Sequence, residues 1–281
     1  MTAPFEVMGV LNVTPDSFSD GDAFLAADAA VAHARGLVAD GAGVVDVGGE
    51  STRPGAAPVP ADEELRRVVP VLERLAGLPA RVSIDTSKAA VARAALERGA
   101  EIVNDVTALR GDAEMAGLVA STGATCCLVH MRGTPQTMQD APSYRDVVSD
   151  VKEFLEQRLA FATAEGVAEE RVWLDPGFGF GKTIEHNLEL LRRLGEICAI
   201  GRPVVLGTSR KGFLGRITGR AQRDLGAATV ATAVMGFERG ARVFRVHDVR
   251  EHVDALKVAA ATVGATGATV GRRPARASED T

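Results

Sequence analysis

The feature that most constrains this chain is a unit that recurs along it. In each copy a helix-like stretch ends in glycine, a short apolar run follows, and the run ends in a polar residue. The unit is clearest at residues 35–46 (RGLVADGAGVVD) and returns at 93–104, 117–130, 161–175 and 237–245. Helices often end on a glycine in the left-handed conformation, so we predict helix ends at Gly41, Gly99, Gly123, Gly166 and Gly240.

Eight apolar runs of strand length lie along the chain. They lie near residues 6–12, 43–47, 81–85, 101–105, 124–130, 171–175, 203–208 and 242–247. The runs are continuous rather than alternating, which is typical of parallel strands covered on both faces. Strands that alternate with helices indicate a parallel sheet, and eight such units in about 250 residues match a TIM barrel. We predict an α/β fold, a single-domain (β/α)₈ barrel over residues 1–262, with an open doubly wound sheet as the alternative.

The segments outside these units differ in composition. Residues 263–281 are rich in Gly, Ala, Thr and Arg, which predicts a disordered C-terminal tail. The clearest long loops are expected at residues 14–26, 51–60 and 132–144.

Composition and charge limit the partners of the protein. The chain has 281 residues, 46% of them hydrophobic and 25% charged, with a net charge of −5, which is ordinary for a globular protein and unlike a nucleic-acid binder. It shows neither a basic start before a long apolar run nor about 20 consecutive apolar residues. Its three cysteines lack regular spacing, which favours a reducing compartment. We therefore expect a cytoplasmic protein that binds neither nucleic acid nor membrane.

Nearly every apolar run ends in a polar residue. These residues are Asn12, Asp46, Asp85, Asn104, His130, Asp175, Ser209, and Arg245 with His247. In α/β barrels the chemistry lies at the C-terminal ends of the strands, so we expect them on one rim. Any single one can be a satisfied structural group, and this interpretation is strongest for Asp46. Several carboxylates buried together without partners would be costly, which favours a ligand site.

The same rim is rich in cations, which are Arg53, Arg210, Lys211, Arg245 and His247. Carboxylates and amides suit a ligand face that presents N–H donors, whereas Arg and His suit phosphate oxygens. We therefore predict a small ligand with two chemical faces, one of which carries phosphate.

Three other sequence features could indicate other kinds of site, but each is weaker evidence than the ring of polar strand ends. Residues 176–183 (PGFGFGKT) resemble a nucleotide P-loop, but Pro176 stands where its first glycine belongs. Cys126, Cys127 and His130 could suggest zinc, but they lie in an apolar run where free cysteine is commonly just buried. Lys211 could form a Schiff base, but it follows its strand beside Arg210, which favours a hydrogen-bonding or electrostatic role.

Seven motifs, in order from about Met8 to Ala260, resemble those of the dihydropteroate synthase family. They are MGVLNVTPDSFSDG (8–21), GGESTRPG (48–55), SIDTSK (83–88), IVNDV (102–106), DPGFGFGKT (175–183), GTSRKGFLG (207–215) and FRVHDV (244–249). The resemblance implies a (β/α)₈ barrel transferase of folate biosynthesis. Such an enzyme joins 6-hydroxymethyl-7,8-dihydropterin diphosphate to p-aminobenzoate and releases diphosphate, with Mg²⁺ as cofactor. It also implies a homodimer inhibited by sulfonamides.

The resemblance assigns roles to individual residues at the strand ends. It implies that Asp175 pairs with the pterin's 2-amino group and ring N–H, for which two carboxylate oxygens are well suited. Asn104 and Asp85 match further pterin-binding positions, and Lys211 matches the lysine that reaches the pterin ring. Arg245 and His247 match the pair that binds diphosphate, and Asn12 matches the asparagine that ligates Mg²⁺. The resemblance implies that the catalytic groups are Asp85, Asp175, Lys211, Arg245 and His247.

The remaining roles fall on loops. Thr52, Arg53 and Pro54 match the second loop, near diphosphate and p-aminobenzoate, while Phe180 and Ser209 are expected on the aminobenzoate side. The first loop, with Asp16, Phe18 and Asp20, is expected to close over the substrates. Two alternatives share the fold: a pterin-dependent methyltransferase domain and a non-catalytic pterin-binding paralogue. The motifs ESTRPG, SRK and RVHD favour the synthase.

Overall fold

Eight parallel strands form the centre of the molecule. A computed structural model describes residues 4–14 and 23–263. The strands are β1 (Glu6–Asn12), β2 (Val44–Gly48), β3 (Arg81–Asp85), β4 (Ile102–Asp105), β5 (Thr125–Val129), β6 (Val172–Asp175), β7 (Val205–Leu206) and β8 (Val243–Val246). Their order is β6-β5-β4-β3-β2-β1-β8-β7. A parallel bridge between Leu174 and Val204 joins the two ends of this order and closes the ring.

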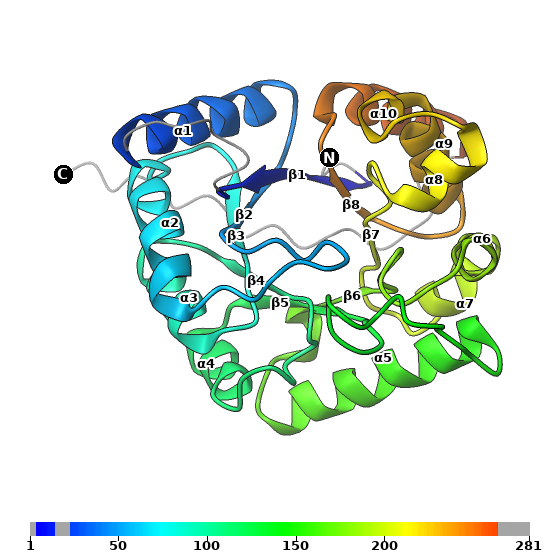
Figure 1. Cartoon of the computed structure of the whole chain (residues 1–281), viewed down its shortest axis with the longest axis horizontal. Helices are drawn as coiled ribbons and strands as arrows, with labels where there is room; N and C mark the ends of the chain where they lie inside the picture. Colours follow the sequence, from blue (N-terminus) through cyan, green and yellow to red (C-terminus); the bar gives the residue numbers. More distant parts are fainter. Residues whose placement is uncertain (1–3, 15–22, 264–281) are drawn as a thin grey trace.

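Helices surround the ring of strands (Figure 1). They are α1 (Ala23–Ala39), α2 (Ala61–Arg74), α3 (Ala89–Glu97), α4 (Met115–Thr122), α5 (Val147–Ala164), α6 (Ile184–Arg192), α7 (Leu194–Cys198), α8 (Gly212–Thr218), α9 (Gly226–Glu238) and α10 (Val249–Val263). Strands and helices alternate, with extra helices after β6 and β7. The predicted (β/α)₈ barrel is confirmed, and the alternative of an open doubly wound sheet is wrong.

The helix ends follow the recurring sequence unit. All five glycines at the predicted helix ends have positive φ. At Gly99, for example, φ is +92°, a conformation in which a side chain would be strained. In these five units the next strand begins two to six residues after the glycine, so a local backbone preference helps to set where those helices stop.

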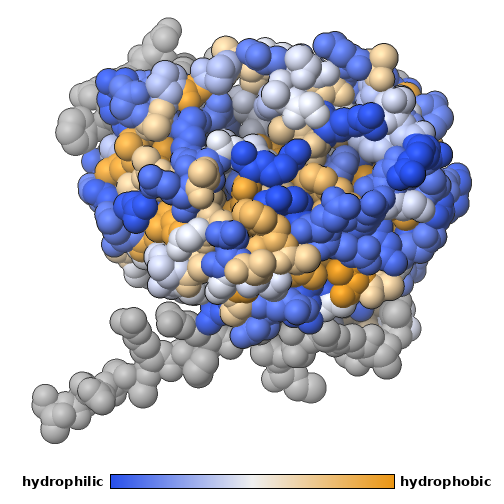
Figure 2. Space-filling model, turned by 90° about the horizontal axis from the view of Figure 1, so that it is seen from below, coloured by the Kyte–Doolittle hydropathy of each residue, from blue (hydrophilic) through white to orange (hydrophobic). Residues whose placement is uncertain are grey.

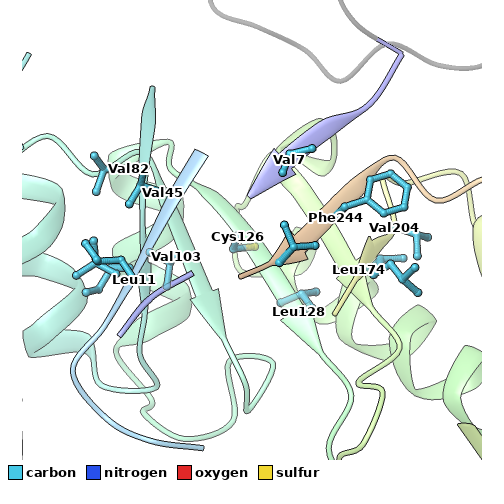
Figure 3. Close-up of a cluster of buried hydrophobic side chains, with 14 of the residues drawn as sticks. Val7, Leu11, Val45, Val82, Val103, Cys126, Leu128, Leu174, Val204 and Phe244 are labelled. Carbon is cyan, nitrogen blue, oxygen red and sulfur yellow. The ribbon is translucent and has the colours of Figure 1, made fainter. Parts of the chain in front are cut away.

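Two apolar layers explain why the apolar runs are continuous. One layer lies between strands and helices and includes Val45, Val103 and Leu128 (Figure 3). The other fills the barrel and includes Val44 and Trp173. Successive strand residues point to opposite faces, so both faces of each strand are buried and neither can be polar along its full length.

The outside of the barrel mixes residue types. Helix α2 buries Val68, Val71 and Leu72, at helical spacing, and exposes charged residues on its other side. On the face shown in Figure 2, hydrophobic residues are interspersed among hydrophilic ones. In the described part of the chain, no helix is long and apolar enough to cross a membrane.

Helix α10 lies at the predicted C-terminal end of the barrel and is the last element that the structure describes. This helix ends at Val263, one residue past the predicted end of the barrel. The predicted tail therefore lies outside the described residues from 264 onward, and the first-loop residues Asp16, Phe18 and Asp20 also lie outside them.

A matched pair of glycine substitutions tests the helix-end argument. Gly36 is exposed within α1, and a Cβ added there or at Gly99 would meet no atom within 4 Å. We expect Gly36→Ala to raise the free energy of unfolding by roughly 0.5–1 kcal/mol through helix propensity. We expect Gly99→Ala to lower it by roughly 1–2 kcal/mol through backbone strain. Urea unfolding measures both, and two changes of the same sign would contradict the argument.

Candidate functional site

A cavity of about 1140 Å³ opens at the C-terminal ends of the strands. Ten of the predicted site residues line it: Asn12, Thr52, Arg53, Pro54, Asp85, Phe180, Ser209, Lys211, Arg245 and His247. The other two predicted residues in the described range, Asn104 and Asp175, are buried at the ends of β4 and β6. The structure thus brings together residues that the sequence spreads over more than two hundred positions.

The residues on the floor of the cavity are determined by the alternation of side chains along the strands, in which every second residue points into the barrel. Met8, Val44, Ile102, Trp173 and Val243 belong to the apolar cluster inside the barrel. Two residues further along their strands lie Val10, Asp46, Asn104, Asp175 and Arg245. Side chains two apart share a face, so a layer that is polar except at Val10 lies directly on the apolar filling.

Arg245 connects the polar groups of this floor. Its Nε donates to Asp46 Oδ2 and its Nη2 donates to Asp85 Oδ2, both at 2.7 Å. Asn104 Nδ2 also donates to Asp46 Oδ2, at 3.1 Å. The sequence puts Asp46 at the end of its apolar run, whereas in the structure it lies in the middle of β2 and is fully buried. Its contacts show that it holds Arg245 and Asn104.

Burial and charge act against each other on this floor. Burial raises the pKa of Asp85 to about 7, although the Arg245 cation opposes the rise. Burial alone would lower the pKa of Arg245, but Asp46 and Asp85 outweigh it and the pKa is raised. Arg245 therefore stays charged, and its charge is what allows two carboxyl groups to lie close together.

Asp175 is oriented by its own loop. Its Oδ1 accepts a hydrogen bond from the backbone N–H of Gly177 at 2.7 Å. Its Oδ2 lies next to Gly207, 3.5 Å from where a Cβ on that residue would stand. Burial raises the pKa of Asp175, and the Gly177 N–H opposes that rise. The carboxyl group is thus fixed in direction and retains acceptor capacity for a ligand.

Ser209 and His247 form a pair with a defined proton arrangement. The backbone N–H of His247 donates to Ser209 Oγ at 3.1 Å, and Ser209 Oγ lies 2.9 Å from His247 Nδ1. Burial, with the Arg245 and Arg210 cations, lowers the pKa of His247 to about 3. The ring is therefore neutral, and the Ser209 hydroxyl can donate to Nδ1. This assignment leaves the hydrogen on Nε2, where it can be donated to an anion.

Two adjacent cations after β7 have different partners. Arg210 donates to both carboxylate oxygens of Asp248, which ties the turn after β7 to the residue after His247. Lys211 instead lies with its Nζ 4.1 Å from the centre of the Phe180 ring. Burial and the nearby Arg245 lower the pKa of Lys211 to about 8. Of the two, Lys211 is the cation available to a ligand.

Lys182 is a buried lysine to which the sequence assigned no role. Its Nζ lies 2.9 Å from His130 Nδ1, 2.9 Å from the Gly177 carbonyl oxygen and 3.0 Å from that of Phe180. In a P-loop this lysine would bind a phosphate, but here it holds its own loop together. The near-match to the P-loop motif was the only sign of Lys182 in the sequence. Its contacts could not be read from the sequence, because two of its acceptors are backbone carbonyl oxygens.

The loop after β5 also contributes to the cavity, which the sequence did not predict. Met138 and Gln139 line it, and Gln139 Nε2 donates to the Gly179 carbonyl oxygen at 2.6 Å. The sequence marks residues 132–144 as a long loop, but neither side-chain type signals chemistry.

The cysteines do not converge. Cys126 belongs to the layer under the helices and Cys127 to the barrel interior, so their side chains point to opposite faces of β5. His130 is engaged by Lys182. Within residues 4–14 and 23–263, no group of three His, Cys, Asp or Glu side chains is arranged to hold a metal ion.

Comparisons with known proteins find related sequences and structures. The family model described as "Pterin binding enzyme" matches residues 8–247. The dihydropteroate synthase of Mycobacterium leprae (strain TN) is 50% identical over 266 residues, covering 92% of this chain and 94% of the relative. The structure of Xanthomonas albilineans dihydropteroate synthase with 4-aminobenzoic acid superposes with a TM-score of 0.86, at 47% identity and 92% coverage of each chain. A Yersinia pestis dihydropteroate synthase with a sulfonamide drug complex also gives a TM-score of 0.86, at 43% identity, covering 92% of this chain and 94% of that one.

The buried lysine gives a test based on pH. Burial lowers the pKa of Lys182 from its ordinary 10.5 to about 7. Between these values the unfolded chain holds a proton that the folded chain lacks, so raising the pH favours folding. We expect the free energy of unfolding of the native protein, minus that of Lys182→Met, to rise between pH 7 and 10.5 by at most about 1.4 kcal/mol per pH unit. Urea unfolding across this range measures it, and a difference independent of pH would contradict the lowered pKa.

Proposed function

The chain belongs to the dihydropteroate synthase family of pterin-binding enzymes, and on this basis we propose how its residues share the reaction. The enzyme condenses a dihydropterin-6-ylmethyl diphosphate with p-aminobenzoate to give dihydropteroate and diphosphate. One observation carries the assignment of roles: ten of the predicted site residues line a single cavity.

We propose that the pterin ring binds at the floor. Asp175 has a direction fixed by Gly177 and suits the two N–H donors of the pterin's 2-amino group and ring nitrogen. Asn104 and Asp85 face each other in the register of β4 and β3 and supply further polar contacts. We assign a contact with the pterin ring to Lys211, whose Nζ lies 4.1 Å from the centre of the Phe180 ring.

Diphosphate binds next to the pterin, at Arg245 and His247. Arg245 carries a permanent charge at the edge of the floor next to Asp85, and the neutral His247 ring can donate from Nε2. In the reaction the bond between the pterin methylene carbon and the diphosphate oxygen breaks, and the electron pair leaves with diphosphate. Arg245 and His247 stabilise that departing anion, while Asp85 and Asp175 stabilise positive charge delocalised over the pterin.

The second substrate lies between loops. Thr52, Arg53 and Pro54 line the same cavity as Phe180 and Ser209, and we propose that p-aminobenzoate binds among them. Its amino nitrogen forms the new bond to the methylene carbon and then loses a proton. The Xanthomonas complex with 4-aminobenzoic acid and the Yersinia complex with a sulfonamide support both this ligand and inhibition by sulfonamides. Asp16, Phe18 and Asp20 are proposed to close over the substrates and exclude water.

The donor set fits Mg²⁺ only if the substrate completes it. Asn12 lines the cavity together with Asp85 and Arg245, and its side chain has one neutral amide oxygen. Mg²⁺ usually keeps waters and binds substrate phosphates through few protein ligands, so one oxygen plus diphosphate is a suitable set. When bound, the ion would neutralise charge on the leaving diphosphate.

A homodimer and a cytoplasmic location complete the proposal. Ile217, Met235 and Val258 are large hydrophobic residues exposed on α8, α9 and α10, which suits a subunit interface there. Cys126 and Cys127 are buried and Cys198 is half-buried, all as free thiols, which suits a reducing compartment.

A turnover assay tests the activity. The protein with pterin diphosphate, p-aminobenzoate and Mg²⁺ should release diphosphate and form dihydropteroate. Absence of product would favour the non-catalytic paralogue, and methyl transfer from a pterin to a corrinoid protein would favour the methyltransferase alternative.

Asp175→Asn tests the pterin pocket. The amide replaces one acceptor oxygen with a donor, so one pterin N–H loses its partner. We expect at least roughly 100-fold weaker binding of a pterin that lacks diphosphate, or about 2.7 kcal/mol. Calorimetric titration measures it, with thermal unfolding as the check on folding. Unchanged affinity would contradict the role of Asp175.

His247→Ala tests the diphosphate pocket. The change removes the proposed Nε2–H donor, which faces only the diphosphate part of the ligand. We expect affinity for pterin diphosphate to fall by roughly tenfold, while affinity for the pterin without diphosphate changes little. The ratio of the two titrations is the measurement, and equal losses would count against the assignment.

A further inference from the structure

Glu50, Lys88 and Glu64 form a charged cluster beside the site. Lys88 Nζ donates to Glu50 Oε2 at 2.5 Å and to Glu64 Oε2 at 2.6 Å. Glu50 and Lys88 stand in the motifs GGESTRPG and SIDTSK, and the proposed roles leave both residues unused. We propose that these three residues are a clamp that positions the loop of residues 49–60, called loop 2, and thereby sets the affinity for p-aminobenzoate. This inference rests on the proposed function.

Glu50 fastens both ends of loop 2. Its Oε1 accepts a hydrogen bond from the backbone N–H of Val59 at 2.9 Å, which closes the loop on itself. Its Oε2 binds Lys88, at the N-terminal end of α3. Because Thr52, Arg53 and Pro54 lie between Glu50 and Val59, this side chain limits where those cavity residues can move.

The start of loop 2 is also packed tightly against α2. A Cβ on Gly49 would come within 2.9 Å of Glu64 Cγ and 3.3 Å of the Glu64 carbonyl oxygen. Arg67 Nη1 donates to the Gly49 carbonyl oxygen at 2.8 Å. The loop therefore leaves β2 along a path determined by α2, and α3 supplies Lys88 to hold it. Figure 1 shows the loop, in blue, reaching toward the centre of the ring from the side of α2 and α3.

The burial of Glu64 makes Lys88 necessary. The Glu64 side chain is fully buried, and its Oε1 has no hydrogen-bond partner among the described residues. Burial alone would lower the pKa of Lys88, but its hydrogen bonds to Glu50 and Glu64 raise it, so the cation is kept. An ion pair buried in this way adds little to stability, and removal of one partner is costly. A positioning role explains why such a group is present.

The first test separates positioning from folding. Lys88→Met would leave Glu64 as a buried unpaired charge, so the single variant loses stability as well as the clamp. The double variant Lys88→Met/Glu64→Gln removes that charge, and we expect it to recover most of the lost stability. It should still show a KM for p-aminobenzoate raised about tenfold, because misplacement of contacting residues weakens binding. Its affinity for a pterin lacking diphosphate should match that of the native protein.

Two further variants are matched controls. Arg98→Met breaks the ion pair of Arg98 Nε with Glu73 Oε1, at 3.2 Å, which also joins α3 to α2 but involves no residue of loop 2 or of the cavity. It should leave both KM values unchanged. Lys88→Arg retains a cation between the two carboxylates and should keep the KM for p-aminobenzoate near the native value.

A measurement without turnover separates this inference from the proposed function. In the double variant, hydrogen exchange of the Val59 amide and its loop neighbours should be faster than in the native protein and in Arg98→Met. A native KM for p-aminobenzoate, or a parallel loss of pterin affinity, would overturn the clamp. If the native enzyme shows no turnover, the proposed function fails. The clamp has its own test: if hydrogen exchange in loop 2 is as slow in the double variant as in the native protein, the clamp is overturned.

Discussion

The site depends on the two ion pairs that Arg245 forms with Asp46 and Asp85. This guanidinium lies between Asp46 and Asp85, residues that are 199 and 160 positions away in the sequence. Without that charge the floor would hold buried carboxylates with no counter-ion, and they would take up protons. With it, the carboxylate that we propose for the pterin and the cation that we propose for diphosphate can lie side by side, with Asp85 Oδ2 and Arg245 Nη2 2.7 Å apart. The barrel makes this possible because β8 closes against β1, next to β2.

The barrel also explains how a polar floor can be stable. Buried ion pairs contribute little net stability, since the loss of hydration offsets their attraction. The two apolar layers on either side of each strand provide the stability instead, because burial of apolar surface is the dominant favourable contribution to folding. On the inward faces of β2, β4, β6 and β8, the polar residues Asp46, Asn104, Asp175 and Arg245 follow apolar ones toward the cavity. Departures from an apolar core at such positions are characteristic of functional sites.

The fold could be predicted because its signals are local. A glycine such as Gly99 ends a helix through its own backbone conformation, and a run such as Val44–Val47 indicates a strand covered on both faces. The strand-end residues of the cavity, such as Asn12, Asp85 and Arg245, could be predicted for a related reason: parallel strands deliver their last residues to one rim. The role of Asp46 could not be predicted, because its partners come from two other strands. The contacts of Lys182 could not be predicted either, since its acceptors are carbonyl oxygens whose direction depends on the folded loop.

The loops show where the strand-end argument stops. Gly55 N–H donates to the Pro135 carbonyl oxygen at 3.0 Å, Gln139 binds the Gly179 carbonyl oxygen, and Lys182 binds the loop that contains Gly179. The loops after β2, β5 and β6 are therefore joined through backbone acceptors, with Lys88 at one end of this arrangement and Lys182 at the other. Each lysine is held by partners within the protein and so is withdrawn from the ligand. The cavity cations to which we assign ligand contacts are then Lys211 and Arg245 near the strand ends and Arg53 in loop 2, while Arg216 and Arg220 also line the cavity.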